Sequence, residues 1–413
     1  MGYVRQVTNP NRFDSLDILR GIAMCGILFA NVHVFSGYII ASPENIAAVD
    51  RWGTDAAVHA LERIFLEGKF YSIFSLLFGV GLSVQLRASS AQDPDFTPRY
   101  RRRLKILAAI GFAHMTLLWA GDILLLYAIL GFALFALRDR DDQSLTRWIL
   151  ILLASPIAWY TLLWVARVPD LLGGPPPGPN STGPSLMDTV RTAMATGNYL
   201  EVQKANIVWI VGRWVDLIIT ARFPKVLGMF LLGLLLERRG IFRAPEQHSA
   251  LISRTLWIGL VGGIALNGLA AWLAPQRPML PGSPLGALQI TASAIGTPLL
   301  ALGYVALVIR MLEHSFTAAL LTPFRAVGRT ALSNYLTQSL VCAFLFFGYG
   351  LGWFGTVGLT EGMLIALAVV AVLIPLSNLW VRGFTFGPVE WIWRQATYRK
   401  RLPIRRGAEE RTS

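Results

Sequence analysis

Charged residues are scarce in this sequence, and the common motifs of soluble enzymes are missing from it. Asp, Glu, Lys and Arg make up 15% of the 413 residues, whereas soluble domains carry about 25%. So small a share excludes a large water-facing surface. The chain also contains no HExxH, Walker loop, GxSxG or paired-carboxylate motif. The sequence therefore predicts no metal site and no permanently bound cofactor.

Cysteine is almost absent as well. The two cysteines, Cys25 and Cys342, both lie inside apolar segments and form no CxxC pair. Neither a disulfide framework nor a thiolate metal site is predicted. A cleavable signal peptide is not expected either, because a polar stretch precedes the first apolar run and no A-x-A-like site follows it.

Long hydrophobic segments recur along the whole chain. Hydrophobic residues make up 54% of it, and the mean hydropathy is +0.52. About 20 apolar residues in a helix cross a hydrocarbon core roughly 30 Å thick. We therefore predict an all-α, polytopic membrane helix bundle forming a single membrane domain over residues 1–413. It has about ten transmembrane helices, at 17–40, 70–87, 103–120, 122–138, 147–167, 223–237, 255–274, 288–311, 330–351 and 362–381.

Basic and non-basic loops alternate between these segments. Arginines gather at 99–103, at 238–243 and in the tail from 394, whereas the loop at 44–67 is net acidic. The positive-inside rule therefore predicts a bacterial inner-membrane protein with both chain ends in the cytoplasm. The rule also accounts for the formal net charge of +13. The expected partner is thus the lipid bilayer, not nucleic acid, and no oligomeric state is predicted.

The membrane domain divides into portions of different composition. Residues 1–140 form an N-terminal four-helix portion that carries the candidate site, and 168–222 form a periplasmic loop. The end of this loop, near 207–220, has the pattern of an interfacial or re-entrant helix. A C-terminal helical portion at 223–382 precedes a basic cytoplasmic tail at 383–413. No internal repeat is evident, which counts mildly against a transporter built on inverted repeats.

Polar residues inside the first span are the first functional candidates. An ionisable group in the bilayer costs about 2.5–3.5 kcal/mol and is therefore a default candidate for function. Asp17 and Arg20 are three residues apart, and Asn31 returns to within about 20° of Arg20 on a regular helix. We expect these three residues to form a stripe that faces the bundle and binds substrate or donor. An Asp17–Arg20 ion pair at the inner interface is the alternative.

A histidine and a carboxylate lie close together in the hairpin of the third and fourth spans. His114 comes shortly before the tight turn at Gly121, and Asp122 follows it. A carboxylate that orients an imidazole is the usual general-base arrangement. Two alternatives remain: Asp122 caps the next helix, and His114 is a satisfied core residue. His33, near the outer end of the first span, is a second candidate base.

Further polar residues are candidates for binding substrate or donor. Glu67 and Lys69 lie at the outer mouth of the second span, where they could line a cavity or compensate each other. Arg102 and Arg103 at the inner end of the third span could meet phosphates. Asn334 and Gln338 share one face of the ninth span, with interhelical hydrogen bonding as the alternative.

Five stretches of the chain resemble one bacterial membrane family. SLDILRGIAMCGILFANV, EGKFYSIFSLLFGVG, GFAHMTLLWAGDILLLYAILG, GRTALSNYLTQS and GPVEWIWR are similar to segments of the YeiB-like family, grouped as domain of unknown function 418. This family looks distantly similar to the acyltransferase-3 proteins and to heparan-glucosaminide acetyltransferase, which share the Arg-Gly pair found here at Arg20. Where acyltransferase-3 proteins carry a histidine after this arginine, the present chain has Asn31, and His33 follows two residues later.

The resemblance implies an acyltransferase. It would move an acyl group from a cytoplasmic donor, with acyl-CoA as co-substrate, to a small-molecule, glycan or lipid acceptor at the outer face. His114 or His33 would act as general base, Asp122 would orient the imidazole, and Asn31 or Lys69 would stabilise negative charge. A proton-coupled or small-molecule transporter using the same polar residues is the rival hypothesis, and a non-catalytic membrane scaffold is the third.

Overall fold

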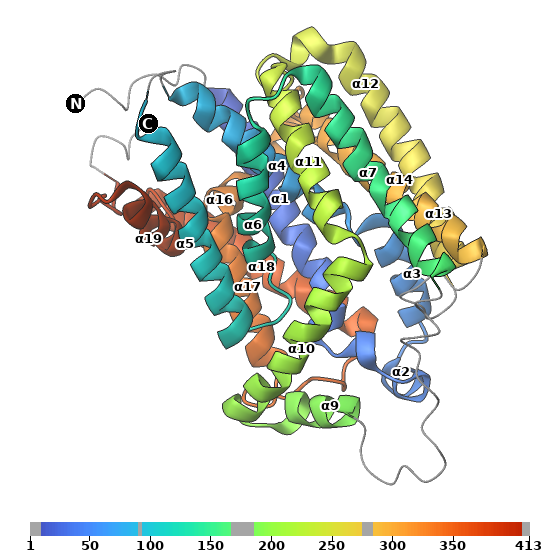
Figure 1. Cartoon of the computed structure of the whole chain (residues 1–413). Coiled ribbons are helices and arrows are strands. Elements are labelled where there is room, and N and C mark those ends of the chain that lie inside the picture. Colours follow the sequence, from blue (N-terminus) through green and yellow to red (C-terminus); the bar gives the residue numbers. More distant parts are fainter. Residues whose placement is uncertain (1–9, 90–92, 167–185, 275–283, 407–413) are drawn as a thin grey trace.

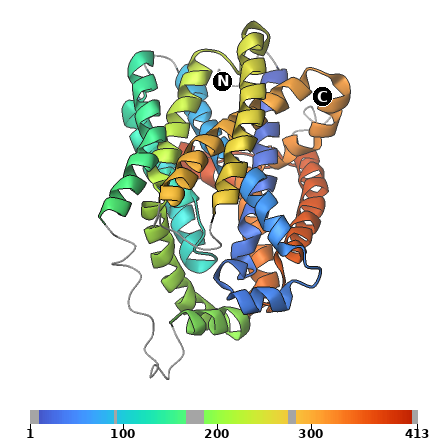
Figure 2. The ribbon, with the colours of Figure 1, turned by 90° about the vertical axis from the view of Figure 1, so that its right-hand side faces the viewer.

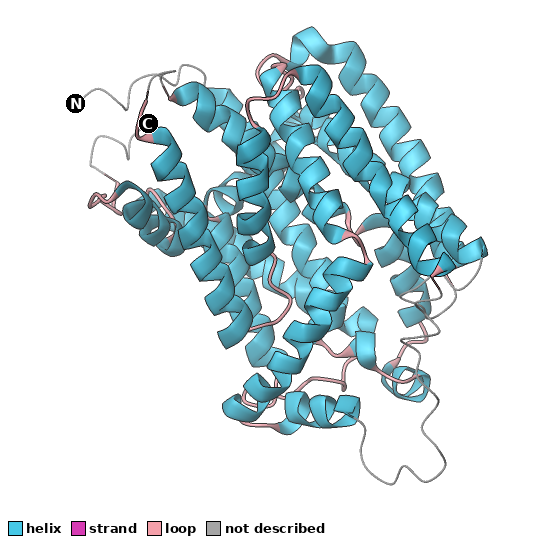
Figure 3. Cartoon of the chain, viewed as in Figure 1, coloured by secondary structure: helices cyan, strands magenta, loops and turns pink. Residues whose placement is uncertain are grey.

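The computed structural model describes residues 10–89, 93–166, 186–274 and 284–406, and nearly all of their regular structure is helical (Figures 1 and 3). These residues form no strand; Phe384 and Arg405 make an isolated antiparallel bridge. The fold class predicted from the sequence, an all-α polytopic helix bundle, is confirmed.

The first part of the described chain forms seven α-helices and one short 3₁₀ turn. They are α1 (Pro10–Phe35), η1 (Tyr38–Ile40), α2 (Pro43–Val49), α3 (Asp55–Phe65), α4 (Lys69–Ala88), α5 (Phe96–Leu117), α6 (Leu124–Leu137) and α7 (Asp142–Val165). The central part comprises α9 (Leu186–Thr196), α10 (Tyr199–Ile219), α11 (Arg222–Arg238), η2 (Pro245–His248), α12 (Ser249–Trp257), η3 (Ile258–Gly262) and α13 (Gly263–Leu273). The last part comprises α14 (Pro284–Leu312), α15 (Ser315–Leu321), α16 (Pro323–Arg329), α17 (Ala331–Phe346), α18 (Leu359–Gly383) and α19 (Pro388–Tyr398).

Each of the ten predicted spans coincides with one of these helices, α12 and α13 together making one of them. Six helical segments are long and apolar enough to cross a membrane, or up to seven if the bent pair of α10 and α11 is one span. The helices α6 and α17 are apolar but shorter. The first span ends at Phe35, before the predicted residue 40, because Gly37 turns the chain with a φ of 77°. The chain is thus a membrane protein by the composition of its helices.

The segment predicted as a loop with an interfacial or re-entrant helix is largely helical. Residues 168–185 lie outside the described part, and the remainder forms α9 and α10. The axis of α10 meets that of α11 at 64°. Ala221 allows this break by adopting the left-handed conformation, with a φ of 47°. The structure therefore has a broken helix at the place where the sequence predicts an irregular one.

Glycine allows the closest helix contacts in the bundle. A Cβ on Gly79 of α4 would lie 1.8 Å from the carbonyl oxygen of Phe230, and one on Gly233 of α11 would lie 1.9 Å from that of Leu76. The two helices therefore pack backbone against backbone. A Cβ on Gly81 would meet nothing within 4 Å, so Gly81 takes no part in this close contact.

The beginning of α1 and the tail helix α19 lie at one end of the bundle, and α2 and α9 lie at the other (Figures 1 and 2). Glu390 anchors α19, since its Oε1 accepts hydrogen bonds from the backbone N–H groups of Leu332 and Ser333. Burial raises the pKa of the Glu390 carboxyl, although these bonds oppose the rise.

Candidate functional site

Two adjoining cavities lie inside the bundle, in the half nearer α2 and α9. The first has a volume of about 330 Å³ and the second of about 370 Å³. They share wall residues, namely Ile39, Glu67, Gly68, Tyr71, Asp216 and Arg222. We call them the basic and the apolar compartment of one chamber. Its walls come from α1, α3, α4, α7, α9, α10, α11, α13, α14 and α17 and from the turn between α5 and α6, so the site extends beyond residues 1–140.

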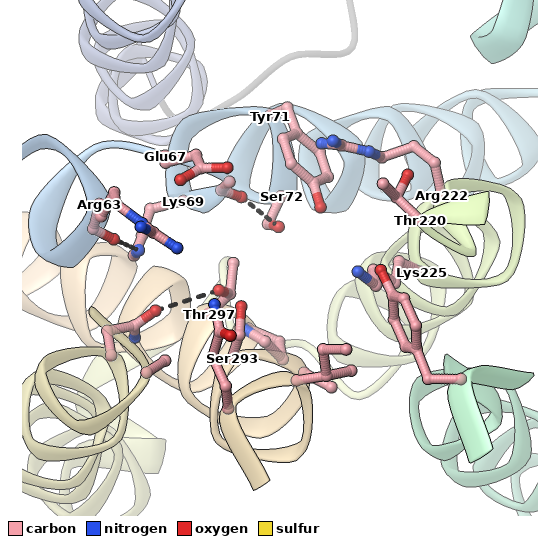
Figure 4. Close-up of a pocket in the computed structure, with 18 of the residues that line it drawn as sticks. Arg63, Glu67, Lys69, Tyr71, Ser72, Thr220, Arg222, Lys225, Ser293 and Thr297 are labelled. Carbon is pink, nitrogen blue, oxygen red and sulfur yellow. Dashed lines mark hydrogen bonds between the residues drawn. The ribbon is translucent and has the colours of Figure 1, made fainter. Parts of the chain in front are cut away.

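Six ionisable side chains line the basic compartment: Arg63, Glu67, Lys69, Asp216, Arg222 and Lys225. Figure 4 shows Arg63, Glu67 and Lys69 on one side and Arg222 and Lys225 across the space from them. Four cations thus face two carboxylates.

Lys69 is held in place by a hydrogen bond to the backbone of α3. Its side chain is buried, and its Nζ donates to the carbonyl oxygen of Arg63 at 2.6 Å. Gly68, immediately before it, adopts the left-handed conformation with a φ of 84° and so lets α4 begin beside the cavity. A Cβ there would also come within 2.8 Å of Thr297. The positions of Glu67 and Lys69 thus agree with the prediction that they could line a cavity at the outer mouth of the second span.

Arg222, which the sequence reasoning missed, lies where the two compartments meet. Its guanidinium carbon is 4.5 Å from the centre of the Tyr71 ring, a distance typical of a cation–π contact. Its Nε is buried and has no hydrogen-bond partner among the described residues. Arg222 and Lys225 precede the long apolar part of their segment, so the sequence alone indicated only a basic flank.

The apolar compartment is lined mainly by aliphatic and aromatic side chains, among them Ile27, Val34, Ile40, Trp119, Val208 and Trp209. Its polar wall includes Asn31, His33, Arg213 and Tyr335. Arg213 bonds to Asp216 at 2.8 Å and is thereby compensated. This compartment can hold a hydrophobic group next to an imidazole.

His33 is paired with a carboxylate that the sequence reasoning did not single out. The Nδ1 of His33 lies 2.6 Å from Oε1 of Glu62, whose side chain is 2% exposed. The two residues are 29 positions apart and belong to α1 and α3. Asp55 and Glu62 are both buried and seven residues apart on α3, the spacing of one helix face. The sequence signal that could have indicated Glu62 was the presence of two carboxylates on the inward face of an amphipathic helix.

His114 and Asp122 form a second pair, deeper in the protein. His114 Nδ1 lies 2.9 Å from Asp122 Oδ1, and the two side chains are 1% and 0% exposed. The other carboxylate oxygen accepts from the backbone N–H of Leu125 at 2.7 Å, so Asp122 also caps α6. Neither residue lines the chamber. Tyr335, whose ring centre is 5.0 Å from that of His114, lies in its wall.

The predicted residues at the other end of the bundle do not reach the chamber. Arg20 bonds to Asp17 at 2.5 Å, and neither lines the chamber. The structure therefore does not bring Asp17, Arg20 and Asn31 together at the chamber: the ion-pair alternative describes the first two, and Asn31 alone of the three faces the chamber.

Two arginines expected to meet phosphates hold the tail helix instead. Arg102 donates to the carbonyl oxygen of Thr397 at 2.9 Å. The Arg103 guanidinium lies 4.2 Å from the centre of a Trp393 ring. Both contacts tie α5 to α19, so these side chains are engaged within the protein.

Asn334 and Gln338 of α17 are buried and also lie outside the chamber walls. The Asn334 amide donates to the carbonyl oxygen of Val327 and to the hydroxyls of Thr330 and Ser377. Interhelical hydrogen bonding, the alternative interpretation, therefore describes Asn334. The side-chain nitrogen of Gln338 has no partner among the described residues.

Comparison with known proteins assigns the family. The uncharacterized protein YxaH of Bacillus subtilis (strain 168) is 31% identical, covering 98% of both chains. The uncharacterized protein YeiB of Escherichia coli (strain K12) is 30% identical over 94% of this chain and 97% of its own length. The chain belongs to the YeiB-like DUF418 family. The family model, described as a protein of unknown function, matches residues 236–400.

The YeiB-like relatives span the whole chamber, whereas the DUF418 match begins near the end of α11. A third relative, described as an uncharacterized 39.9 kDa protein in the amylase 3' region of Bacillus acidopullulyticus, is 25% identical over 95% of this chain and 96% of its own length. None of these three descriptions names an activity, so function has to be argued from the chamber itself.

Proposed function

We propose that this protein is a membrane-embedded acyltransferase in which His33, oriented by Glu62, is the general base. One observation carries the proposal: an imidazole bonded to a buried carboxylate lies in the wall of the chamber. A carboxylate on Nδ1 fixes the tautomer and leaves Nε2 as the proton acceptor. His33 is preferred to His114 because only His33 lines the chamber.

The reaction follows from this arrangement. His33 removes a proton from an acceptor hydroxyl or amine, whose oxygen or nitrogen then attacks the carbonyl carbon of an acyl thioester. The carbon–sulfur bond breaks, and the departing thiolate takes the proton from His33. Negative charge develops on the carbonyl oxygen, and the chamber cations, among them Lys69 and Arg222, favour it electrostatically. The donor is an acyl-CoA from the cytoplasm, and the acceptor is a small molecule, glycan or lipid.

We further propose a location in the bacterial inner membrane with both chain ends in the cytoplasm. The beginning of α1 and the tail helix α19 lie at the same end of the bundle (Figure 1). Arg238 and Arg239 end α11, and the positive-inside rule places such basic ends in the cytoplasm. The chamber then lies in the outer half of the bilayer, which suits an acceptor at the outer face.

The proposal is tested with purified protein in nanodiscs, radiolabelled acetyl-CoA and an extract of bacterial envelope as the source of acceptors. The wild-type protein is expected to transfer label to the acceptor fraction. Glu62→Gln should lower the rate at least tenfold, because general-base catalysis contributes about 10²–10⁴-fold. Wild-type protein that transfers no label would contradict the proposal.

Transport is the second candidate, and the break between α10 and α11 favours it. Discontinuous helices with inward-facing ends form substrate sites in many transporters, and Asp216, Thr220 and Arg222 flank the break and line the basic compartment. Uptake into proteoliposomes without consumption of acyl-CoA would support transport. A chamber lined by ionisable groups favours either candidate over a non-catalytic scaffold.

A further inference from the structure

We infer that the two compartments together bind an anionic amphiphile, with a phosphate group in the basic compartment and an apolar chain in the apolar compartment. As the identity of the acyl acceptor, this inference rests on the proposed transferase function. As a binding site, it can be measured without any turnover.

The charge of the basic compartment favours a phosphate group. Arg63, Lys69, Arg222 and Lys225 face Glu67 and Asp216, so four positive side chains oppose two negative ones and leave a formal excess of at least two. No described carboxylate lies within 4.0 Å of any of the four cations; Asp216 is bonded to Arg213. Unpaired cations inside a membrane protein are costly. A phosphate monoester, with about −1.5 to −2 charge near neutral pH, offsets this excess, whereas a single carboxylate offsets half of it.

The placement of these cations also suits a phosphate group. Arg222 and Lys225 approach from one side of the space and Arg63 and Lys69 from the opposite side (Figure 4). Such an arrangement surrounds a tetrahedral anion that has several acceptor oxygens. The buried Arg222 Nε has no partner among the described residues, and a guanidinium pairs well with phosphate oxygens. The same helix end adds a positive dipole, since α11 begins at Arg222 and runs for 17 residues.

The adjoining apolar compartment suits a hydrophobic chain attached to the phosphate. The basic compartment meets it at Glu67, Gly68, Tyr71 and Arg222, which line both. Beyond them, aliphatic and aromatic side chains such as Val34, Ile40, Trp119, Val208 and Trp209 form the walls. Free phosphate would leave these surfaces without a ligand. An apolar chain attached to the phosphate occupies both compartments and brings the head group near His33.

The test uses radiolabelled decyl phosphate and the full-length protein in maltoside detergent, a medium whose own apolar chains carry no phosphate. Wild-type protein is expected to bind the probe at one saturable site. Arg222→Gln and Lys225→Gln should each weaken binding at least tenfold. Arg254→Gln is the matched control: it removes the same charge from an exposed position on α12 and should bind like wild type. Inorganic phosphate should compete at least a hundredfold less well than unlabelled decyl phosphate.

Three results would overturn the inference: no saturable binding, unchanged affinity in Arg222→Gln and Lys225→Gln, or inorganic phosphate competing as well as decyl phosphate. The third would assign the site to free phosphate. Lys225→Gln keeps the test decisive should Arg222→Gln fail to fold. Binding of decyl phosphate is measured without acyl-CoA and without turnover, so a failed transferase reaction and a failed binding site give different results.

Discussion

His33 and His114 each bond to a carboxylate, and access to the chamber distinguishes them. His33 is in the chamber wall, whereas His114 and Asp122 are fully enclosed behind it. The sequence allowed the prediction that His114 and Asp122 meet, because eight residues and a tight turn separate them. It did not allow the pairing of His33 with Glu62, because that contact depends on how α3 folds back against α1. Long-range pairing of this kind is decided by tertiary packing.

At this scale we expect His114→Ala to be destabilising. Removing His114 leaves the buried Asp122 Oδ1 without its hydrogen-bond partner, and an unsatisfied buried polar group costs about 1–3 kcal/mol. The exposed His59 serves as control, and His59→Ala should change stability by no more than about 0.5 kcal/mol. Unfolding in detergent measures both. An equally stable His114→Ala protein that has lost acyl transfer would instead indicate a chemical role for His114.

Among the helices, the contact between α4 and α11 builds one wall of the chamber. Gly79 and Gly233 allow the two backbones to touch, and Lys69 and Arg222 at the beginnings of these helices then face the same cavity. The sequence predicted the ten apolar helical segments because each has a continuous apolar run. It predicted only an irregular segment before α11. The residue that adopts the left-handed conformation there is Ala221 and not a glycine, so the sequence does not mark the break.

The glycine contact gives a prediction with a matched control on the same helix. Gly79→Ala places a methyl group 1.8 Å from a carbonyl oxygen, whereas Gly81→Ala places one in open space. We expect Gly79→Ala to lose about 1–3 kcal/mol of stability, as overpacked sites do. Gly81→Ala should be neutral or slightly stabilising, because alanine favours the helix. Thermal unfolding distinguishes them, and equal melting temperatures would rule out the close packing of α4 on α11.

At the scale of the whole molecule, the orientation of the protein in the membrane decides from which side of the bilayer the acceptor enters the chamber. The alternation of basic loops predicted both ends on one side, and the structure brings the beginning of α1 and the helix α19 to one end of the bundle. The chamber itself could not be predicted, because its walls combine ten α-helices that lie far apart in the sequence. Its cations, such as Arg222, look in the sequence like ordinary residues flanking a span.

Orientation can be measured with single introduced cysteines, since Cys25 and Cys342 are buried. In intact cells, a membrane-impermeant maleimide should label Glu44→Cys, at the α2 end of the bundle, and should not label Gln247→Cys, at the opposite end. Both positions are exposed. The reverse pattern would place the chamber in the cytoplasmic half and contradict an acceptor at the outer face.

The most direct test of the central claim compares acyl transfer by His33→Ala with that by His59→Ala. Both variants lose one histidine, but only His33 lines the chamber and bonds to Glu62. We predict that His33→Ala reduces the transfer of label from acetyl-CoA at least a hundredfold, while His59→Ala keeps the wild-type rate. Transfer at the wild-type rate by a folded His33→Ala protein would show that the pair of His33 and Glu62 is not the catalytic base.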